Sequence, residues 1–436
     1  MGRADASRWR EAVKPTLRGR WMRFWFEPAD PANLGVCRLL FFGALFFYFL
    51  PRDFSPWGEV SKVFWMPIAL FKGFHLPLLS PTRIFFLQTV WKMALLLSCL
   101  GLAARLSTLT SFILGIYLLG LPHNFGKTHL FDAMVVFTLG ILALSHCGDA
   151  WSLDRLIQTA RKEKIEPVRP SGEFTWPVRA VWLVMSLIFF AAGVSKLRRS
   201  GLGWFTSDGM ATILIQQNYH ISNADPLTPW GLYLAQNRWL SRGMALMTVF
   251  FELGYPLAMF DGRARWIFVP GILGMLAGIR LVMGPTFELF IICQLFWVPW
   301  DRVGAWIVSR FRAQKKFAVF YDGSCGLCKR TMSVIRSLDL LNRVEIYNVT
   351  DDWPEISRRF PHLNRGACLE DMHAVTADGK TAAGFDAYRA LAKVLPLGWL
   401  LLPFLYFPFV RPAGIRIYRG IASGRHQGSC RRDKSS

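Results

Sequence analysis

The chain has 436 residues, of which 53% are hydrophobic and 15% are aromatic. Its 51 Lys and Arg residues outnumber its 29 Asp and Glu residues and give a formal net charge of +22. Such a charge can indicate nucleic-acid binding, but here the basic residues lie in polar links between long apolar runs. Membrane proteins mark their cytoplasmic loops in this way. We therefore predict the lipid bilayer, and no nucleic acid, as a partner.

Apolar segments recur along the first 300 residues. A helix needs about 20 apolar residues to cross a bilayer, and fewer where Trp, Tyr or Arg anchors its ends. By this criterion residues 34–300 form an α-helical integral membrane domain after a basic segment at 1–33. The eight predicted spans lie near Leu34–Leu50, Ile84–Ala104, Leu106–Leu121, Phe131–Ser145, Val178–Val194, Gly243–Phe260, Trp266–Leu281 and Thr286–Trp300.

The basic residues also predict the orientation. Seven lie in residues 1–33, six in 147–179 and five in 301–316, whereas the links around Lys127 and Met283 carry almost none. Eight spans with both termini in the cytoplasm fit this pattern. The link from Lys196 to Arg242 fits less well, because it places five basic residues on the outer side.

From Phe317 onward the pattern is that of a small α/β domain. "FAVFY" and "VEIYNV" predict strands on either side of a helix over Gly326–Leu338. A hairpin turning at Asp378-Gly379 and a helix over Phe385–Leu395 follow. This order predicts a thioredoxin-like domain over 317–426, after a basic linker at 301–316 and before a tail at 427–436. Its apolar segment 395–410 holds three prolines, which favour an amphipathic lid or a membrane-surface segment over a ninth span.

Two cysteines, Cys325 and Cys328, lie at the predicted start of this first helix. There the first sulfur faces unpaired backbone N–H groups and the positive end of the helix dipole, which stabilise a thiolate. Cys325 is therefore the predicted attacking residue and Cys328 the residue that resolves the mixed disulfide. Asp322 and Gly323 supply the tight turn between strand and helix.

Two other interpretations of the thiol pair stay open. It could be half of a zinc site, for which Cys368, Cys430, His362 and His373 are available, although none of them forms a second close pair. The thiols could also be idle. We expect no metal.

"VFYDGSCGLC", "DGKTAAGFDAYRALAKVLP" and "YRGIASGR" resemble the DCC family of thiol-disulfide oxidoreductases. The resemblance covers about the last quarter of the chain. It implies a thioredoxin-like fold in which Cys325 and Cys328 form a redox-active disulfide. No proline occurs between Pro361 and Pro396. The cis-proline that faces the thiols of thioredoxins is therefore missing, and their mode of substrate binding is not carried over.

In "FFAAGVSKLRRSGLGWF", Lys196 ends an apolar helix. An ionisable group at membrane depth usually faces a cavity or a partner. Burial disfavours its charged form, and a neutral amine is a usable base. Alternatively the side chain extends to the lipid headgroups beside Arg198 and Arg199.

"AAGVSKL", with Trp204 and Gly209 after it, resembles the segment that carries the catalytic lysine of vitamin-K-dependent gamma-carboxylases. "HNFGKTHLFDAMVVFTLGILALSHCGDAWSLDRL" resembles their histidine helix. The resemblance spans about residues 34–300 and extends to the HTTM group of bacterial membrane proteins. It implies Lys196 as catalytic base, His129 as the residue that assists it, a vitamin K or menaquinone-type quinone as cofactor, and the bacterial inner membrane as location.

Two features depart from the carboxylases. The large extracytoplasmic domain that holds their peptide substrate is missing. The helix after the lysine segment has Arg280 and Glu288 in place of a histidine. Together with Glu252 these residues could form intramembrane ion pairs, which either line a polar pocket or hold helices together.

Three hypotheses of function follow. The first is a membrane thiol-disulfide oxidoreductase that acts on an unknown protein or peptide, with a quinone-type ligand in its helical domain. Its predicted orientation puts the thiols in the cytoplasm and Lys196 outside, so a diffusing quinone or another partner must connect them. The second is a carboxylase-like or quinone-epoxidising enzyme with an accessory thiol domain. The third is a non-catalytic maturation factor or scaffold for an exported peptide, which would tolerate the loss of Lys196 and His129.

Overall fold

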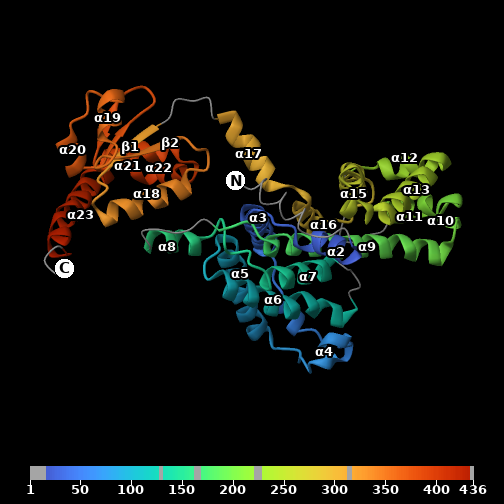
Figure 1. Cartoon of the computed structure of the whole chain (residues 1–436). Helices are drawn as coiled ribbons and strands as arrows, with labels where there is room; N and C mark the ends of the chain where they lie inside the picture. Colours follow the sequence, from blue (N-terminus) through green and yellow to red (C-terminus); the bar gives the residue numbers. More distant parts are fainter. Residues whose placement is uncertain (1–15, 127–130, 162–167, 220–227, 312–316, 433–436) are drawn as a thin grey trace. The chain divides into compact units, whose positions relative to one another are not determined.

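The computed structural model describes residues 16–126, 131–161, 168–219, 228–311 and 317–432 (Figure 1). The chain divides into two compact units. The membrane unit comprises Met1–Ser152 and Val168–Trp300, and the thiol unit comprises Leu153–Pro167 and Asp301–Ser436. The inclusion of Leu153–Pro167 in the thiol unit was not predicted, because this segment lies between two apolar stretches of the sequence.

Within the described residues, five helices of the membrane unit are long and apolar enough to cross a bilayer. They agree with five of the eight predicted spans. These helices are α3 (Pro31–Phe49), α5 (Pro81–Leu100), α6 (Ala104–Gly120) continued by η3 (Leu121–Phe125), α9 (Trp176–Ser200) preceded by η4 (Gly172–Phe174), and α15 (Gly262–Val282).

The remaining three predicted spans are not confirmed. Their residues form α7 (Phe131–Ala143), α13 (Arg238–Gly254) with α14 (Leu257–Phe260), and α16 (Glu288–Cys293) with η5 (Gln294–Trp297). Each helix is shorter than a span requires. Proline bounds two of them, because Pro256 follows α13 and Pro299 follows η5. The other elements of this unit are α2 (Leu17–Phe26), η1 (Ser55–Gly58), η2 (Lys62–Phe64), α4 (Ala69–Gly73), α10 (Gly203–Thr206), α11 (Gly209–Tyr219) and α12 (Trp230–Gln236).

A buried arginine of α3 forms hydrogen bonds to the turn at the end of the "HCGDAWS" segment. Arg38 is fully buried, and its guanidinium donates to backbone carbonyls of Ser98, Cys99, Cys147 and Trp151. The distances to Cys99, Cys147 and Trp151 are 2.8, 3.0 and 2.6 Å. A buried guanidinium is tolerated when its donors are satisfied in this way. The turn that leads toward Leu153 is therefore held in one place.

The thiol unit is built on a four-stranded mixed sheet of order β2-β1-β3-β4. Strand β1 (Phe317–Tyr321) pairs in parallel with β2 (Val344–Asn348) and antiparallel with β3 (His373–Val375), which pairs antiparallel with β4 (Thr381–Ala383). Side chains alternate across β1. Phe317 and Val319 pack with α18 (Gly326–Leu338) and α21 (Phe385–Val394), whereas Ala318 and Phe320 pack with α19 (Trp353–Arg359) and α20 (Arg365–Glu370).

This topology confirms the predicted order of a β-α-β unit followed by a hairpin and a helix. The bounds of β1 and α18 are those predicted, and the hairpin turns at Gly379, where φ is 84°. Helices α19 and α20 between β2 and β3 were not predicted. The predicted linker at 301–316 begins as a helix, α17 (Trp300–Phe311).

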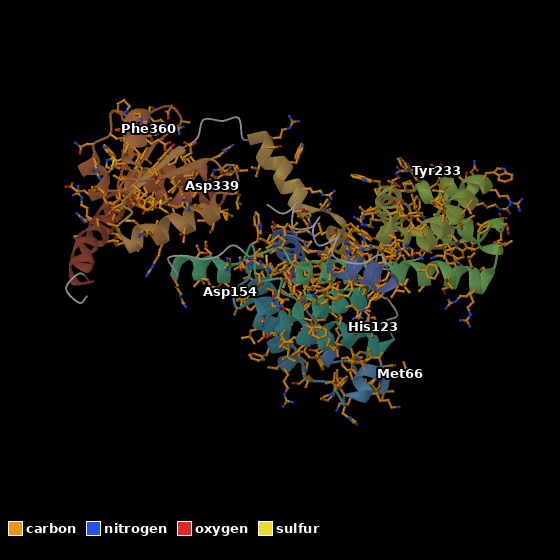
Figure 2. All side chains as sticks on the ribbon, in the orientation of Figure 1. Met66, His123, Asp154, Tyr233, Asp339 and Phe360 are labelled. Atoms are coloured by element: carbon orange, nitrogen blue, oxygen red, sulfur yellow. The ribbon has the colours of Figure 1, made fainter. Side chains whose placement is uncertain are left out.

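The apolar segment 395–410 does not form a straight span. It folds into η6 (Pro396–Leu401) and α22 (Leu402–Leu405), and this run is bent by 118° against α21. The long helix α23 (Val410–Arg432) follows and packs against α21. A second segment joins the unit from a distance in sequence: α8 (Leu153–Arg161), which carries Asp154, packs along α18 (Figures 1 and 2).

Candidate active sites

The thiol pair lies at the start of α18. Cys325 is the N-cap residue, with extended backbone (φ −83°, ψ 116°), and its Sγ accepts a hydrogen bond from the N–H of Cys328 at 3.4 Å. Cys325 is half-buried and Cys328 is 8% exposed, and neither cysteine forms a disulfide in the structure. The first sulfur therefore occupies the helix N-terminus, where backbone N–H groups favour a thiolate.

Two residues shape the loop before the thiols. The Asp322 carboxylate accepts hydrogen bonds from the N–H and hydroxyl of Ser324 at 2.8 and 2.7 Å. A Cβ on Gly323 would lie only 2.0 Å from Oδ1 of Asn348, whose side chain is tied to Asp351 and to the N–H of Thr350. Only glycine fits there, so the predicted roles of Asp322 and Gly323 in the turn have a geometric basis.

Cys368 and Cys430 were the cysteines considered as further ligands of a zinc site. Cys368 is buried, and its burial raises the pKa of the thiol to about 11. The side chain of Cys430 lies outside the described residues. In the described part of the chain, no three His, Cys, Asp or Glu residues could together hold a metal ion.

Lys196, near the end of α9, pairs with Glu252 on α13. Its Nζ lies 2.6 Å from Oε1 and 2.7 Å from Oε2 of that carboxylate. The side chain of Lys196 is 23% exposed and that of Glu252 is 6% exposed. Lys196 therefore has a largely buried carboxylate as its partner.

This pair lines a cavity of about 810 Å³ between α9, α13 and α15. Among its described lining residues, Lys196 and Glu252 are the charged ones, and most others are aliphatic, aromatic, Met or Gly. The ring of Trp204 lies 5.6 Å from the Lys196 Nζ. The buried indole Nε1 of Trp204 has no hydrogen-bond partner among the described residues. An apolar cavity with a few polar groups at one end is the usual form of a small-molecule site.

Glycines set the shape of the cavity. A Cβ on Gly193 would lie 2.9 Å from Leu253 and 3.1 Å from the Cβ of Glu252, so Gly193 allows α13 to approach α9. On α15, Gly274 and Gly278 line the cavity, and a Cβ on either would meet nothing within 4 Å. These two positions leave room for a ligand.

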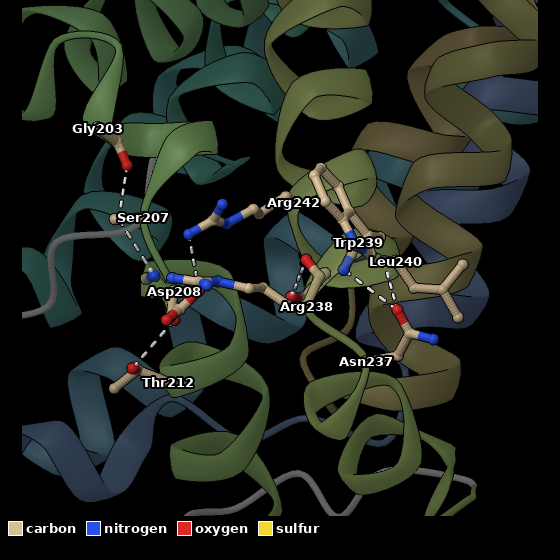
Figure 3. A network of polar contacts seen from close by, with 11 residues as sticks. Gly203, Ser207, Asp208, Thr212, Asn237, Arg238, Trp239, Leu240 and Arg242 are labelled. Carbon is tan, nitrogen blue, oxygen red and sulfur yellow. Dashed lines mark hydrogen bonds and ion pairs between the residues drawn. The ribbon is translucent and has the colours of Figure 1, made fainter.

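A polar network lies at the starts of α11 and α13 (Figure 3). Oδ1 of Asp208, just before α11, accepts hydrogen bonds from Arg238 and Arg242 at 3.0 and 3.1 Å. The Asn237 Oδ1 caps α13 by accepting the N–H groups of Trp239 and Leu240, each at 3.1 Å. The network joins the starts of α11 and α13, so the helix that carries Glu252 has a fixed beginning.

The remaining predicted residues lie elsewhere. Arg280 donates to the carbonyl of Gly284 at 2.8 Å, and neither Arg280 nor Glu288 is among the described residues that line the cavity. Glu252 instead takes Lys196 as its partner, a pairing across 56 residues that the sequence did not indicate. His129 lies outside the described residues.

His123, which precedes His129 in the same sequence segment, was not predicted as a site residue. Nε2 of His123, on η3, lies 3.1 Å from Oδ2 of Asp132 at the start of α7. Both side chains are largely buried, at 18% and 7% exposure. The segment "HNFGKTHLFD" contains both histidines and the aspartate, so the signal was present, but nothing in it indicated which histidine meets the carboxylate.

These features define a class: a membrane protein that joins apolar, membrane-length helices to a thiol-disulfide oxidoreductase domain. Residues 26–277 match the family model of the HTTM domain, and residues 319–431 match that of the DCC1-like thiol-disulfide oxidoreductase. The chain belongs to the HTTM family and carries a DCC1-like domain after its HTTM domain.

One curated relative is similar to part of the chain. It is the uncharacterized chloroplastic protein At5g50100 of Arabidopsis thaliana, 31% identical over 91 residues. The match covers 20% of this chain and 40% of that protein. No solved structure matches the chain significantly.

Proposed function

We propose that this protein is a thiol-disulfide oxidoreductase of the bacterial inner membrane, with cytoplasmic termini, whose helical cavity binds a quinone-type ligand. The redox pair is Cys325 and Cys328, and Lys196 is the base. The observation that carries the quinone part is the Lys196–Glu252 pair at the edge of an apolar cavity, beside the unsatisfied Nε1 of Trp204. A flat apolar molecule with oxygen atoms at its ends matches that combination.

Lys196 and Glu252 share a proton in this proposal. Transfer of a proton from the ammonium to the carboxylate leaves a neutral amine, the form that acts as a base. In a site of low polarity the ion pair and the neutral pair lie closer in free energy than in water, because burial penalises both charges. Lys196 then accepts a hydroxyl proton from a bound hydroquinone, and the Trp204 N–H donates to the oxygen that becomes negative.

At the other site, Cys325 attacks the disulfide of a protein or peptide substrate. Its exposure and its position at the N-cap suit attack on a partner that arrives from water. Cys328, one turn further along the helix, then attacks Cys325 and releases the reduced partner.

The test adds menaquinone to the reduced protein in lipid nanodiscs and follows free thiols at Cys325 and Cys328 by alkylation over time. The wild type is compared with Lys196→Ala and with Gly274→Leu, which fills the cavity without a steric clash. Gly243→Leu is the matched control, because it also meets nothing within 4 Å and lies outside the cavity lining. Bound menaquinone is quantified for every variant.

The proposal expects Gly274→Leu to lose menaquinone and Gly243→Leu to keep it. It expects Lys196→Ala to keep menaquinone and to slow its turnover. The quinone part of the proposal would be overturned if the helical cavity of the wild type bound no menaquinone. Thiol-disulfide exchange would still be supported if the thiols of that protein reacted with a soluble disulfide.

A further inference from the structure

The thiol unit has an apolar cavity of its own. Its volume is about 1030 Å³, and its lining residues come mainly from α18, α21, α23, η6 and α22. Apart from Asp322, Asp371 and Thr331, its described lining residues are aliphatic, aromatic, Met, Cys or Gly. Leu156 of α8 also contributes. A protein core of this size packs without such a space, whereas sites for small apolar molecules have about this volume.

The two thiols differ in their access to this cavity. Cys328 is among its lining residues and Cys325 is not. Met372 lines the cavity as well, and its N–H donates to the hydroxyl of Tyr418 at 3.1 Å. That backbone group is therefore already satisfied inside the unit. The side chains around Cys328 in this cavity are therefore mostly apolar. Such a cavity suits a ligand that needs few hydrogen bonds.

The mouth of the cavity carries apolar side chains that water reaches. Leu400 is 74% exposed, Phe409 78% and Ile417 64%, and all three also line the cavity. Lys393, Arg411, Arg416 and Arg419 belong to the same helices, α21 and α23. Exposed apolar residues with basic neighbours are typical of surfaces that meet anionic lipid. The thiol unit belongs to the same chain as five membrane-length helices, so its effective concentration at a lipid surface is high.

We propose that this second cavity admits a lipid-soluble quinone to the Cys328 thiol, so that the two cysteines serve different partners. Cys325 meets disulfides that arrive from water, and Cys328 faces the quinone. In the redox step the Sγ atoms of Cys325 and Cys328 form a bond and lose two electrons and two protons. The quinone gains both and becomes the quinol. In the reverse direction, a quinol gives two electrons and two protons to the Cys325–Cys328 disulfide that remains after a substrate disulfide has been reduced, which restores the two thiols and leaves the quinone.

This inference rests on the proposed function, and it answers the difficulty that the thiols and Lys196 are predicted on opposite sides of the membrane. A quinone that exchanges electrons at the thiol unit and then diffuses through the bilayer needs no direct relay of electrons across it.

The test fills the cavity from α18. Thr331→Phe places a ring in it, and Ser337→Phe is the matched control. Both hydroxyls donate to the carbonyl four residues earlier, but Ser337 is exposed and does not line the cavity. Ala413→Trp fills the mouth from α23 and serves if Thr331→Phe does not fold. The full-length protein in nanodiscs is photolabelled with an azido-quinone, and the labelled peptides are mapped.

The rate of thiol oxidation by the same quinone is measured in parallel. It is divided by the rate at which the same thiols react with a soluble disulfide, and this ratio corrects for damage to the thiol loop. We expect label on α18, α21 or α23 in the wild type. The filling variants should lose it, and their relative oxidation rate should fall by about tenfold or more. Ser337→Phe should match the wild type.

This inference would be overturned if the label were confined to the membrane unit and if Gly274→Leu, but not Thr331→Phe, slowed thiol oxidation. That result would leave the proposed function intact. If phospholipid displaces the label as readily as quinone does, the cavity is a lipid site, and this result would also overturn the inference. If quinone neither labels the protein nor oxidises its thiols, the proposed function fails along with it.

Discussion

Removal of the Glu252 carboxylate would leave the Lys196 ammonium without its charged partner at the edge of an apolar cavity. In the structure two oxygens of Glu252 lie 2.6 and 2.7 Å from the Lys196 Nζ, and the carboxylate is 6% exposed. The substitutions are Glu252→Leu, Lys196→Leu and the double change.

The magnitude follows from burial. At these distances the attraction between unit charges exceeds about 4 kcal/mol even at an effective dielectric constant of about 20. Desolvation cancels much of it, and the 23% exposure of Lys196 screens a further part. Breaking a buried pair on one side typically costs about 3–5 kcal/mol, whereas replacing both partners with apolar residues is close to neutral. We expect each single change to cost about 3 kcal/mol and the double change about 1 kcal/mol or less.

The assay measures the free energy of unfolding of the full-length protein in mild detergent, by titration with a denaturing detergent and Trp fluorescence. Glu288→Leu is the control for loss of another acidic residue, because Glu288 does not line the cavity. The reasoning would be refuted if each single change cost less than about 1 kcal/mol and the cost of the double change equalled the sum of the two. Additive costs indicate that the two residues are not coupled.

Three further predictions concern the thiol unit. Gly323→Ala should destabilise it by about 1–3 kcal/mol through the contact with Asn348 and slow alkylation of Cys325, whereas Gly420→Ala, which meets nothing within 4 Å, should change neither. Cys328→Ala should accumulate a mixed disulfide with a substrate peptide on a non-reducing gel, and Cys325→Ala should form none; the reverse pattern would exchange their roles. The hydrogen bond from Arg411, with a further one from Arg389, lowers the pKa of Asp386 below its usual value of 3.8. This carboxylate therefore adds stability above about pH 4 that is lost as the pH falls through the lowered value, and Asp386→Asn should flatten the stability of the unit over that acid range, as followed by circular dichroism.

Local pattern was enough for much of the fold. The run Phe317–Tyr321 alternates between two buried faces, and Gly326–Leu338 repeats apolar residues at helical spacing, so both elements were predicted with their correct ends. The two-residue spacing of Cys325 and Cys328 was sufficient to place both thiols on one turn of helix. Hydropathy likewise identified the five membrane-length helices, because length and apolar content are properties of a segment alone.

Contacts across long stretches of chain could not be predicted in this way. Glu252 was considered with Arg280 and Glu288, yet it lies against Lys196, because Gly193 lets α13 come close to α9. The cavity beside Cys328 needs α18, α21 and α23 together, and no one of them predicts an empty space.

The sequence by itself determined the class of this protein, its two kinds of domain and the position of its thiol pair at a helix start, because these depend on residue type and short-range spacing. The tertiary structure alone decided that α8 belongs to the thiol unit, that Lys196 has a carboxylate partner and that Cys328 borders an apolar cavity. Each of these depends on the distance between segments far apart in sequence, which is set by packing, and local periodicity carries no information about it.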